Sequence, residues 1–208
     1  MYVPKHFKED DNAKLHQYIR DYGFGVLIVA DEDGIEANHL PFHLSCEEDG
    51  SPGTLQCHVA RNNPVWQRLK DGGQVLAVFQ GPDGYVSPSW YPSKAETGRV
   101  VPTWNYLAVH AAGEARIVED ATWLKHHLTQ LTNQHESGMK EPWQVDDAPQ
   151  DFTDRLVKAI VGIEIEIETL TGKVKASQNL PERNRAGVKA GLEDSEHPYS
   201  RAMSKFVG

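Results

Sequence analysis

Residues 163–168 alternate strictly between isoleucine and glutamate, and no other stretch of the chain constrains the fold as much. Successive side chains of a β-strand point to opposite faces, so the three isoleucines share one face and the three glutamates share the other. One face of this predicted strand is therefore expected to pack in the core, and the other to meet solvent. The glutamates are interpreted as that solvated face rather than as a cluster of catalytic carboxylates.

Short connections join the other predicted strands. Residues 25–30 form an apolar run, and Asp33-Gly34 is a two-residue turn signal that leads into a strand over 35–44. Further strand patterns occupy 54–60, 74–80 and 103–118, and helices are predicted at 11–21, 120–160 and 181–206. Strands with short connections pair antiparallel, and the strand–helix alternation of a parallel fold is missing. The predicted fold class is mainly β with helical additions (α+β), a closed or split, mostly antiparallel β-barrel, in a single domain over 1–208.

The charge balance excludes one large class of function. The chain carries 21 Lys and Arg against 30 Asp and Glu, a formal net charge of −9. Neutralising phosphates requires a basic surface, so this composition argues against a general nucleic-acid binder. The nearest basic patch, at 173–189, is followed directly by acidic residues.

Targeting signals are also missing from the sequence. No apolar run reaches the length of a membrane span, and the N-terminus lacks the apolar region of a secretory signal. A cytoplasmic location without membrane association is therefore expected.

Motifs for metal binding or nucleophilic catalysis are missing. Ten histidines are present, but none completes an HExxH pattern, and neither Cys46 nor Cys57 has a CxxC partner. No GxSxG nucleophile motif occurs either. We therefore predict no metal site and assign no catalytic residue. His39, His43 and His58 lie on predicted strands, and cofactor contact, metal or haem ligation and a structural role stay open for them.

A candidate anion site lies at 58–64, where a predicted strand ends and a helix begins. Asn63 is a good N-cap, and Pro64 suits the first helical position. Free backbone N–H groups and the positive end of the helix dipole would lie beside Arg61. The same residues also fit an ordinary helix cap with a solvated arginine.

A second polar cluster follows the isoleucine–glutamate strand. Lys175, Ser177, Gln178 and Asn179 combine an ammonium, a hydroxyl and two amides, which are groups that recognise phosphates and amide edges. A polar strand end with a helix cap is the alternative. The long segment 81–102 contains four prolines and several aromatic residues, and segments of this kind inside a compact domain tend to be functional.

Several segments, in the same order, resemble the PaiB-like family of FMN-binding negative transcriptional regulators over nearly the whole chain. The segments are 1–7, 36–42, 58–64, 78–82, 85–94, 101–106, 160–165 and 175–179. The resemblance implies the FMN-binding split β-barrel, in which two protomers pair and FMN lies at the dimer interface. It also implies repression of transcription.

The resemblance leaves the activity open between different classes of protein. It favours a regulator without turnover, and the alternatives are a flavin-dependent oxidoreductase of the pyridoxamine-phosphate-oxidase type and a haem-binding split-barrel protein. A flavin enzyme needs few catalytic side chains, because the cofactor carries the redox chemistry. No helix-turn-helix with a basic recognition helix is evident, so we expect any direct DNA binding to be weak and strongly salt-dependent.

Residues within the family segments are the candidates for contact with FMN. The candidates for its phosphate are Arg61, Lys94, Thr103, Lys175 and Ser177. The candidates for its ring edge are Asn38, His39, Asn105 and Gln178, and further candidates for cofactor contact are His58, Asn63, Trp104 and Asn179. Exposed aromatic residues of 78–106 are expected to form the homodimer interface. These are Trp90, Tyr91, Trp104 and Tyr106.

Overall fold

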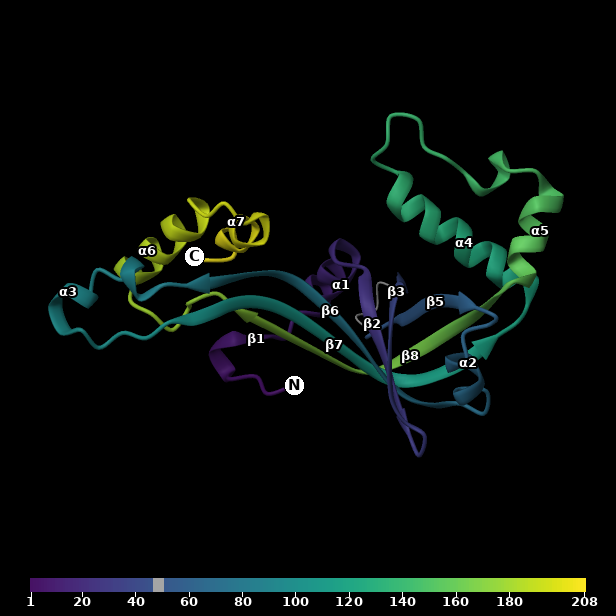
Figure 1. Cartoon of the computed structure of the whole chain (residues 1–208), viewed down its shortest axis with the longest axis horizontal. Coiled ribbons are helices and arrows are strands. Elements are labelled where there is room, and N and C mark those ends of the chain that lie inside the picture. The colour runs from purple at the N-terminus through teal and green to yellow at the C-terminus, as the bar shows by residue number, and fades with distance from the viewer. Residues whose placement is uncertain (47–50) are drawn as a thin grey trace. The chain divides into compact units, whose positions relative to one another are not determined.

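The computed structural model describes residues 1–46 and 51–208 (Figure 1). Its strands are β1 (Lys8–Glu9), β2 (Phe24–Asp31), β3 (Gly34–Pro41), β4 (His43–Ser45), β5 (Thr54–Ala60), β6 (Gly73–Val86), β7 (Thr103–Val118) and β8 (Ile160–Lys175). Its α-helices are α1 (Asn12–Asp21), α2 (Val65–Arg68), α3 (Lys94–Thr97), α4 (Ala121–Glu136), α5 (Gln150–Lys158), α6 (Glu182–Glu193) and α7 (Pro198–Ser204). Its 3₁₀ turns are η1 (Lys5–Phe7), η2 (Pro88–Trp90) and η3 (Val145–Asp147).

The strands hydrogen-bond in the order β3-β2-β6-β7-β8-β5-β4, and β1 pairs with β8 outside this path. The pairs of β2 with β3 and β6, of β5 with β4 and β8, and of β1 with β8 are all antiparallel. Helices α4 and α5 lie within the predicted insertion, and α6 and α7 lie within the predicted C-terminal helical region. The predicted fold class, a mostly antiparallel sheet with helical additions, is confirmed.

The chain divides into two compact units, which are described separately. Unit 1 comprises residues 1–15, 80–109 and 171–208, and unit 2 comprises 16–79 and 110–170. The long strands β6, β7 and β8 each contribute residues to both units. That residues 1–208 form a single domain stays a prediction.

The core of unit 2 follows from the alternating strand. Ile163, Ile165 and Ile167 are buried, and Leu55 of β5 lies opposite Ile165 in the antiparallel register. Full burial of one such side chain contributes about 1.5–3 kcal/mol. The glutamates between them stay half-buried or exposed. The predicted burial pattern of this strand is confirmed.

The β2–β3 hairpin turns where the Asp33-Gly34 pair predicts it. Gly34 has a φ of +104°, which only glycine adopts without strain, and it lies opposite Asp31 in the register. Arg68 of α2 donates to the Asp31 carboxylate at 2.5 and 2.7 Å and to Glu36 at 3.1 Å. These contacts fix α2 against the hairpin.

Strand β6 runs farther than the sequence predicts. The tetrad Gly81-Pro-Asp-Gly84 has turn propensity, but the strand continues through it to Val86. A Cβ built at Gly84 would lie 2.6 Å from Leu192 Cδ2, so this glycine serves the close packing of α6 rather than a turn. Packing in unit 1 overrides the local preference of the tetrad.

Two aromatic residues expected on the surface pack inside unit 1. Tyr91 is buried in a cluster that includes Val188, Leu192 and Met203, and Trp90 packs against the same cluster. A Cβ at Gly191 would lie 2.2 Å from the Trp90 ring, so α6 contacts this ring closely. Of the four aromatic residues expected on the surface, Trp104 is the one that is exposed, at 53%, and Tyr106 is half-buried.

None of the helices in the described ranges is long and apolar enough to cross a membrane.

Candidate functional site

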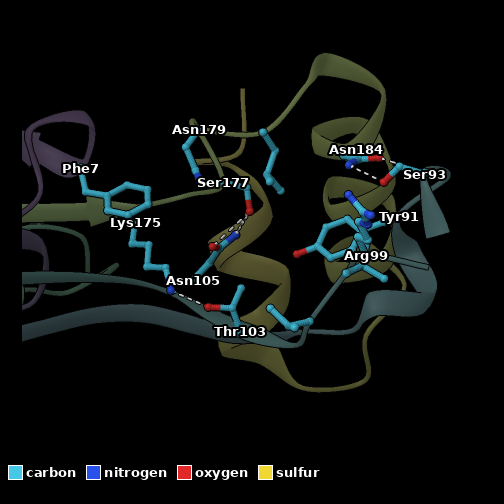
Figure 2. A pocket seen from close by; sticks show the side chains of 13 residues that line it. Phe7, Tyr91, Ser93, Arg99, Thr103, Asn105, Lys175, Ser177, Asn179 and Asn184 are labelled. Carbon is cyan, nitrogen blue, oxygen red and sulfur yellow. Dashed lines mark hydrogen bonds between the residues drawn. The ribbon is translucent and has the colours of Figure 1, made fainter. Parts of the chain in front are cut away.

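A cavity of about 360 Å³ lies within unit 1, at the ends of β7 and β8 (Figure 2). Volumes of this order suit a small-molecule ligand. The lining residues come from η1, from the segment 91–105, from the end of β8 and the turn after it, and from α6. They are Phe7, Tyr91, Ser93, Arg99, Val100, Val101, Thr103, Asn105, Lys175, Ser177, Asn179, Leu180 and Asn184.

The charge of this lining is opposite to that of the chain. Among the described residues that line the cavity, the charged side chains are Lys175 and Arg99, and both are cations. The polar remainder consists of hydroxyl and amide side chains. In a chain of net charge −9, a cavity with cations and without lining carboxylates among the described residues has the chemistry that suits an anion.

Lys175 lies at the end of β8, and its ammonium donates to Thr103 Oγ1 at 2.5 Å (Figure 2). Burial lowers the pKa of Lys175, the nearby Lys173 lowers it further, and Tyr106 acts in the opposite direction. No ion pair of Lys175 is found within residues 1–46 and 51–208. A partly desolvated ammonium without a carboxylate partner favours the approach of an anion.

Ser177 and Asn105 form a buried pair beside Lys175. Asn105 Nδ2 donates to Ser177 Oγ at 2.9 Å, and Asn105 Oδ1 lies 3.2 Å from the same hydroxyl. Ser177 has a φ of +64°, a left-handed conformation that costs a non-glycine residue about 1 kcal/mol or more. This conformation turns the chain at the cavity wall, two residues before Asn179.

The opposite wall depends on Asn184 of α6, which is buried. Its Nδ2 donates to Ser93 Oγ at 2.9 Å, and its Oδ1 accepts from the Ser93 backbone N–H at 3.4 Å. Arg183 beside it pairs with Glu96 of α3 at 2.5 and 2.6 Å. These contacts hold the loop that carries Arg99 into the lining.

Five of the thirteen predicted contact residues come together in this cavity, namely Thr103, Asn105, Lys175, Ser177 and Asn179. Gln178 points back to the chain, where its amide accepts from the Ala176 N–H and donates to the Val174 carbonyl. Lys94 is outside the described lining, and its ammonium lies 3.4 Å from Ser89 Oγ. Trp104 makes an edge contact with Tyr85, at 5.8 Å between ring centroids.

The other predicted residues belong to unit 2, where the Arg61 side chain bonds to three other residues of the protein. Arg61 pairs with Glu119 at 2.5 Å and donates to the carbonyls of Lys158 and Ile160 at 3.0 and 3.1 Å. Its guanidinium is therefore engaged by the protein itself. The 58–64 segment matches the alternative of a structural strand–helix junction more closely than an anion site.

Asn38 and Asn63 are also engaged within unit 2. Asn63 Nδ2 donates to Asn38 Oδ1 at 2.7 Å, and Asn63 Oδ1 accepts from the Val65 N–H at 3.0 Å. Asn38 Nδ2 donates to Glu36 at 3.0 Å. His39 makes a tilted ring contact with Phe24, at 6.4 Å between centroids.

His58 faces a second histidine in unit 2. Its Nδ1 lies 3.0 Å from Nε2 of His127, which is fully buried and stacks on Trp123. Among the described atoms, His127 Nδ1 has no hydrogen-bond partner. Burial and the charges of neighbouring histidines lower the pKa of His127 to about 3, and burial also lowers the pKa of His58. The pair is therefore neutral at pH 7.

The sequence did not point to Phe7, Tyr91, Ser93, Arg99 or Asn184 as site residues. Arg99 and Ser93 lie in the proline-containing segment 81–102, whose composition already indicated function. Asn184 lies one turn into a helix, where nothing in the sequence distinguishes it from a solvated residue. Among the described residues, no group of three or more histidine, cysteine, aspartate or glutamate side chains is placed to hold a metal ion.

Comparison with known proteins assigns the chain to a family. A model of an FMN-binding domain matches residues 1–169. The chain belongs to this FMN-binding domain family. The match includes Thr103 and Asn105 of the cavity, and it ends before Lys175 and Ser177.

Two relatives align with the full length of the chain. The protease synthase and sporulation protein PAI 2 of Bacillus subtilis is 30% identical over 207 residues, which cover 100% of this chain and 96% of that protein. An uncharacterized protein of Emericella nidulans is 36% identical over 241 residues, with the same coverage of the two chains. The resemblance to the PaiB-like family predicted from the sequence is therefore confirmed.

Solved structures share the fold at low sequence identity. A conserved hypothetical protein of Mycobacterium tuberculosis has a TM-score of 0.62 at 14% identity, covering 88% of this chain and 95% of that chain. The FAD and heme binding protein of Mycobacterium smegmatis has a TM-score of 0.61 at 12% identity, covering 94% of this chain and 96% of that chain. At these identities the likeness shows the fold alone, and it supports the predicted split β-barrel.

Proposed function

We propose that the unit 1 cavity binds FMN through its phosphate, and that the protein is a dimeric flavin-binding regulator. The observation that carries this proposal is the lining of the cavity, in which the charged groups are the cations Lys175 and Arg99. The phosphate of FMN is a terminal dianion, so it gains most from a compact site that holds an ammonium, a guanidinium and hydroxyl donors. Family membership supports a flavin as the ligand.

The residues of the cavity divide into two roles in this proposal. Lys175 and Arg99 compensate the phosphate charge, and Thr103 and Ser177 offer hydroxyl hydrogen bonds to its oxygens. Asn105 and Asn179 offer amide groups, which match the alternating donors and acceptors of a flavin ring edge or of the ribityl chain. Bound FMN would supply one- and two-electron redox chemistry, which the side chains of this cavity do not supply themselves.

Exposed apolar side chains in unit 1 support the homodimer. Tyr85 and Trp104 form an exposed edge-to-face pair on β6 and β7, and Val101 of the cavity lining is also exposed. Aromatic residues are enriched in protein interfaces, and a second protomer would cover them. FMN then lies between protomers, as expected for this fold. Sedimentation as a monomer at micromolar concentration would contradict the dimer.

The regulatory role need not involve direct operator binding, because the basic segment 173–189 is largely engaged. Lys173 is buried against Tyr2, Lys175 lines the cavity, and Arg183 pairs with Glu96. We therefore expect weak, salt-sensitive DNA binding with little sequence preference. A specificity ratio on the order of 10³ or more at physiological salt, measured against scrambled DNA, would overturn this expectation.

A flavin-dependent oxidoreductase is the second candidate, and the composition of the cavity lining is compatible with it. A cavity lined by hydroxyl and amide groups leaves room for redox chemistry that needs no side-chain acid or base. Rapid reduction of the bound flavin by NADH or NADPH would move the assignment to this class. Haem is less favoured, because His58, one of its candidate ligands, is engaged by His127.

The decisive experiment compares riboflavin, FMN and FAD on the purified full chain by quenching of flavin fluorescence. A phosphate held by two cations and two hydroxyls is expected to make FMN bind at least about 100-fold more tightly than riboflavin. FAD is expected to bind more weakly than FMN, since its phosphates are internal to the dinucleotide. Equal affinity for riboflavin and FMN would refute the phosphate site, and preference for FAD would reassign the cofactor.

A further inference from the structure

Helix α5 of unit 2 presents its apolar side to solvent. Phe152 and Leu156 lie one turn apart on the same stripe, and they are 46% and 51% exposed. The inward side instead carries Val157, which is buried, together with Thr153 and Asp154, which are half-buried.

The orientation of α5 is set by polar contacts to its neighbour α4, beside which it packs (Figure 1). Asp154 pairs with Lys125 of α4 at 2.7 Å. Thr153 and Lys125 both line a small polar hollow between the helices. An amphipathic helix normally buries its apolar stripe against other residues, whereas Phe152 and Leu156 of α5 remain exposed.

Charges along α5 are separated by sign. Asp151 lies in the first turn, and Arg155 and Lys158 lie in the last. The side chains of Asp151 and Arg155 are 83% and 72% exposed, and they approach each other only to 3.8 Å. Arg155 also lies over the Phe152 ring, at 5.9 Å from its centroid. The attraction between Asp151 and Arg155 is weak at this exposure, so both charges can pair with a partner.

We propose that the outward stripe of α5 docks on the α5 helix of a second copy of this chain, in antiparallel orientation about a two-fold axis. A two-fold contact requires a self-complementary surface. Antiparallel packing supplies one, because Phe152 of each copy meets Leu156 of the other, and the acidic first turn of each helix meets the basic last turn of the other. The opposed helix dipoles add to this match.

Charge argues for a second copy over a lipid surface. A helix that lies on a membrane carries a basic polar face, whereas Asp151 lies in the first turn of α5, and Asp146 and Asp147 lie in the 3₁₀ turn η3 just before it. These carboxylates would be repelled by anionic lipids. The contact is also small. A helix of nine residues buries much less than the 1,200–2,000 Å² of a standard interface, so the pairing is weak when it acts alone. None of the residues of this contact lines the flavin cavity, so the contact is independent of that site.

The test is sedimentation velocity of the full chain from micromolar to millimolar concentration. Phe152→Gln with Leu156→Gln is expected to remove the concentration-dependent association of the wild-type chain. The matched control is Ile35→Gln, which changes an exposed apolar residue in the β2–β3 hairpin and is expected to leave the association unchanged. Unchanged far-UV circular dichroism establishes that the variants are folded.

A charge exchange tests the two-fold geometry and does not depend on the apolar variants. Asp151→Arg and Arg155→Asp, each alone, place like charges opposite one another and are expected to weaken association by about tenfold. The double variant restores opposite charges across the contact and is expected to recover most of the loss. Association that is unaffected by all these variants overturns the proposal. The proposal is also overturned if the variants self-associate like the wild-type chain and lose only co-sedimentation with phosphatidylglycerol vesicles.

Discussion

The two units contain the same kinds of polar side chain, and they use them differently. In unit 2, Arg61, Asn38 and Asn63 are paired with other protein groups. In unit 1, Lys175 and Arg99 line a cavity without a carboxylate beside them among the described residues. Residue type alone therefore does not mark a binding site. A binding site is indicated instead by a charged group for which the fold supplies no partner of opposite charge.

Replacing the central cation of each unit gives the sharpest test of this difference. Lys175→Met is expected to weaken FMN binding by about 10- to 100-fold, because it removes one charge-assisted hydrogen bond to the phosphate. Arg61→Met is expected to leave FMN affinity unchanged and to lower the free energy of unfolding by about 2 kcal/mol, through the lost bonds to two carbonyls. Fluorescence titration and urea unfolding measure the two effects. If Arg61→Met weakens FMN binding as strongly as Lys175→Met does, the proposed difference between the two units is wrong.

The buried histidine pair predicts a pH dependence that belongs to unit 2. The pKa of His127 is about 3 in the folded chain, below its ordinary value of 6.5, so the unfolded chain binds the proton more readily. The stability is complete above pH 6.5 and is lost as the pH falls from 6.5 toward 3. We expect a loss of about 2 kcal/mol between pH 6.5 and pH 5, measured by urea unfolding.

His127→Gln is expected to flatten this dependence, because an amide can still hydrogen-bond His58 but does not titrate. The control is His126→Gln, since His126 is the exposed neighbour on the same helix. FMN affinity, which depends on unit 1, should follow a different pH profile. Equal flattening in the control variant would show that the dependence arises from histidines in general.

The strained residue of the cavity wall predicts separable effects on stability and on binding. Ser177→Gly and Ser177→Ala both leave the buried Asn105 amide without its hydroxyl partner, which lowers stability. Because glycine relieves the φ of +64°, Ser177→Gly is expected to be about 1 kcal/mol more stable than Ser177→Ala. It also removes the hydroxyl that contacts Asn105, so FMN binding is expected to weaken by about fivefold to tenfold. Ser177→Ala keeps the strain and removes the same hydroxyl, so it separates the two effects. A gain of FMN affinity in Ser177→Gly would argue against a binding role.

The fold was more predictable than the site, and particular elements show why. The Ile/Glu alternation of β8 and the Asp33-Gly34 turn depend on neighbouring residues, whose geometry is local. The burial of Tyr91 and the extension of β6 through Gly84 depend on α6, which lies about a hundred residues later in the chain. The outward stripe of α5 likewise depends on contacts with α4 on its other side, where Val157 is buried and Asp154 pairs with Lys125.

The sequence by itself determined the strand pattern, the antiparallel class, the family and the residue types that suit an anion. Only the tertiary structure decided which of those residues keep free hydrogen-bonding capacity. Arg61 and Lys175 are equally plausible phosphate ligands in the sequence, but folding brings Glu119 to Arg61 and brings a hydroxyl, not a carboxylate, to Lys175. The physical reason is that a desolvated charge must be balanced, and only three-dimensional contacts determine whether the protein or a ligand supplies the balance.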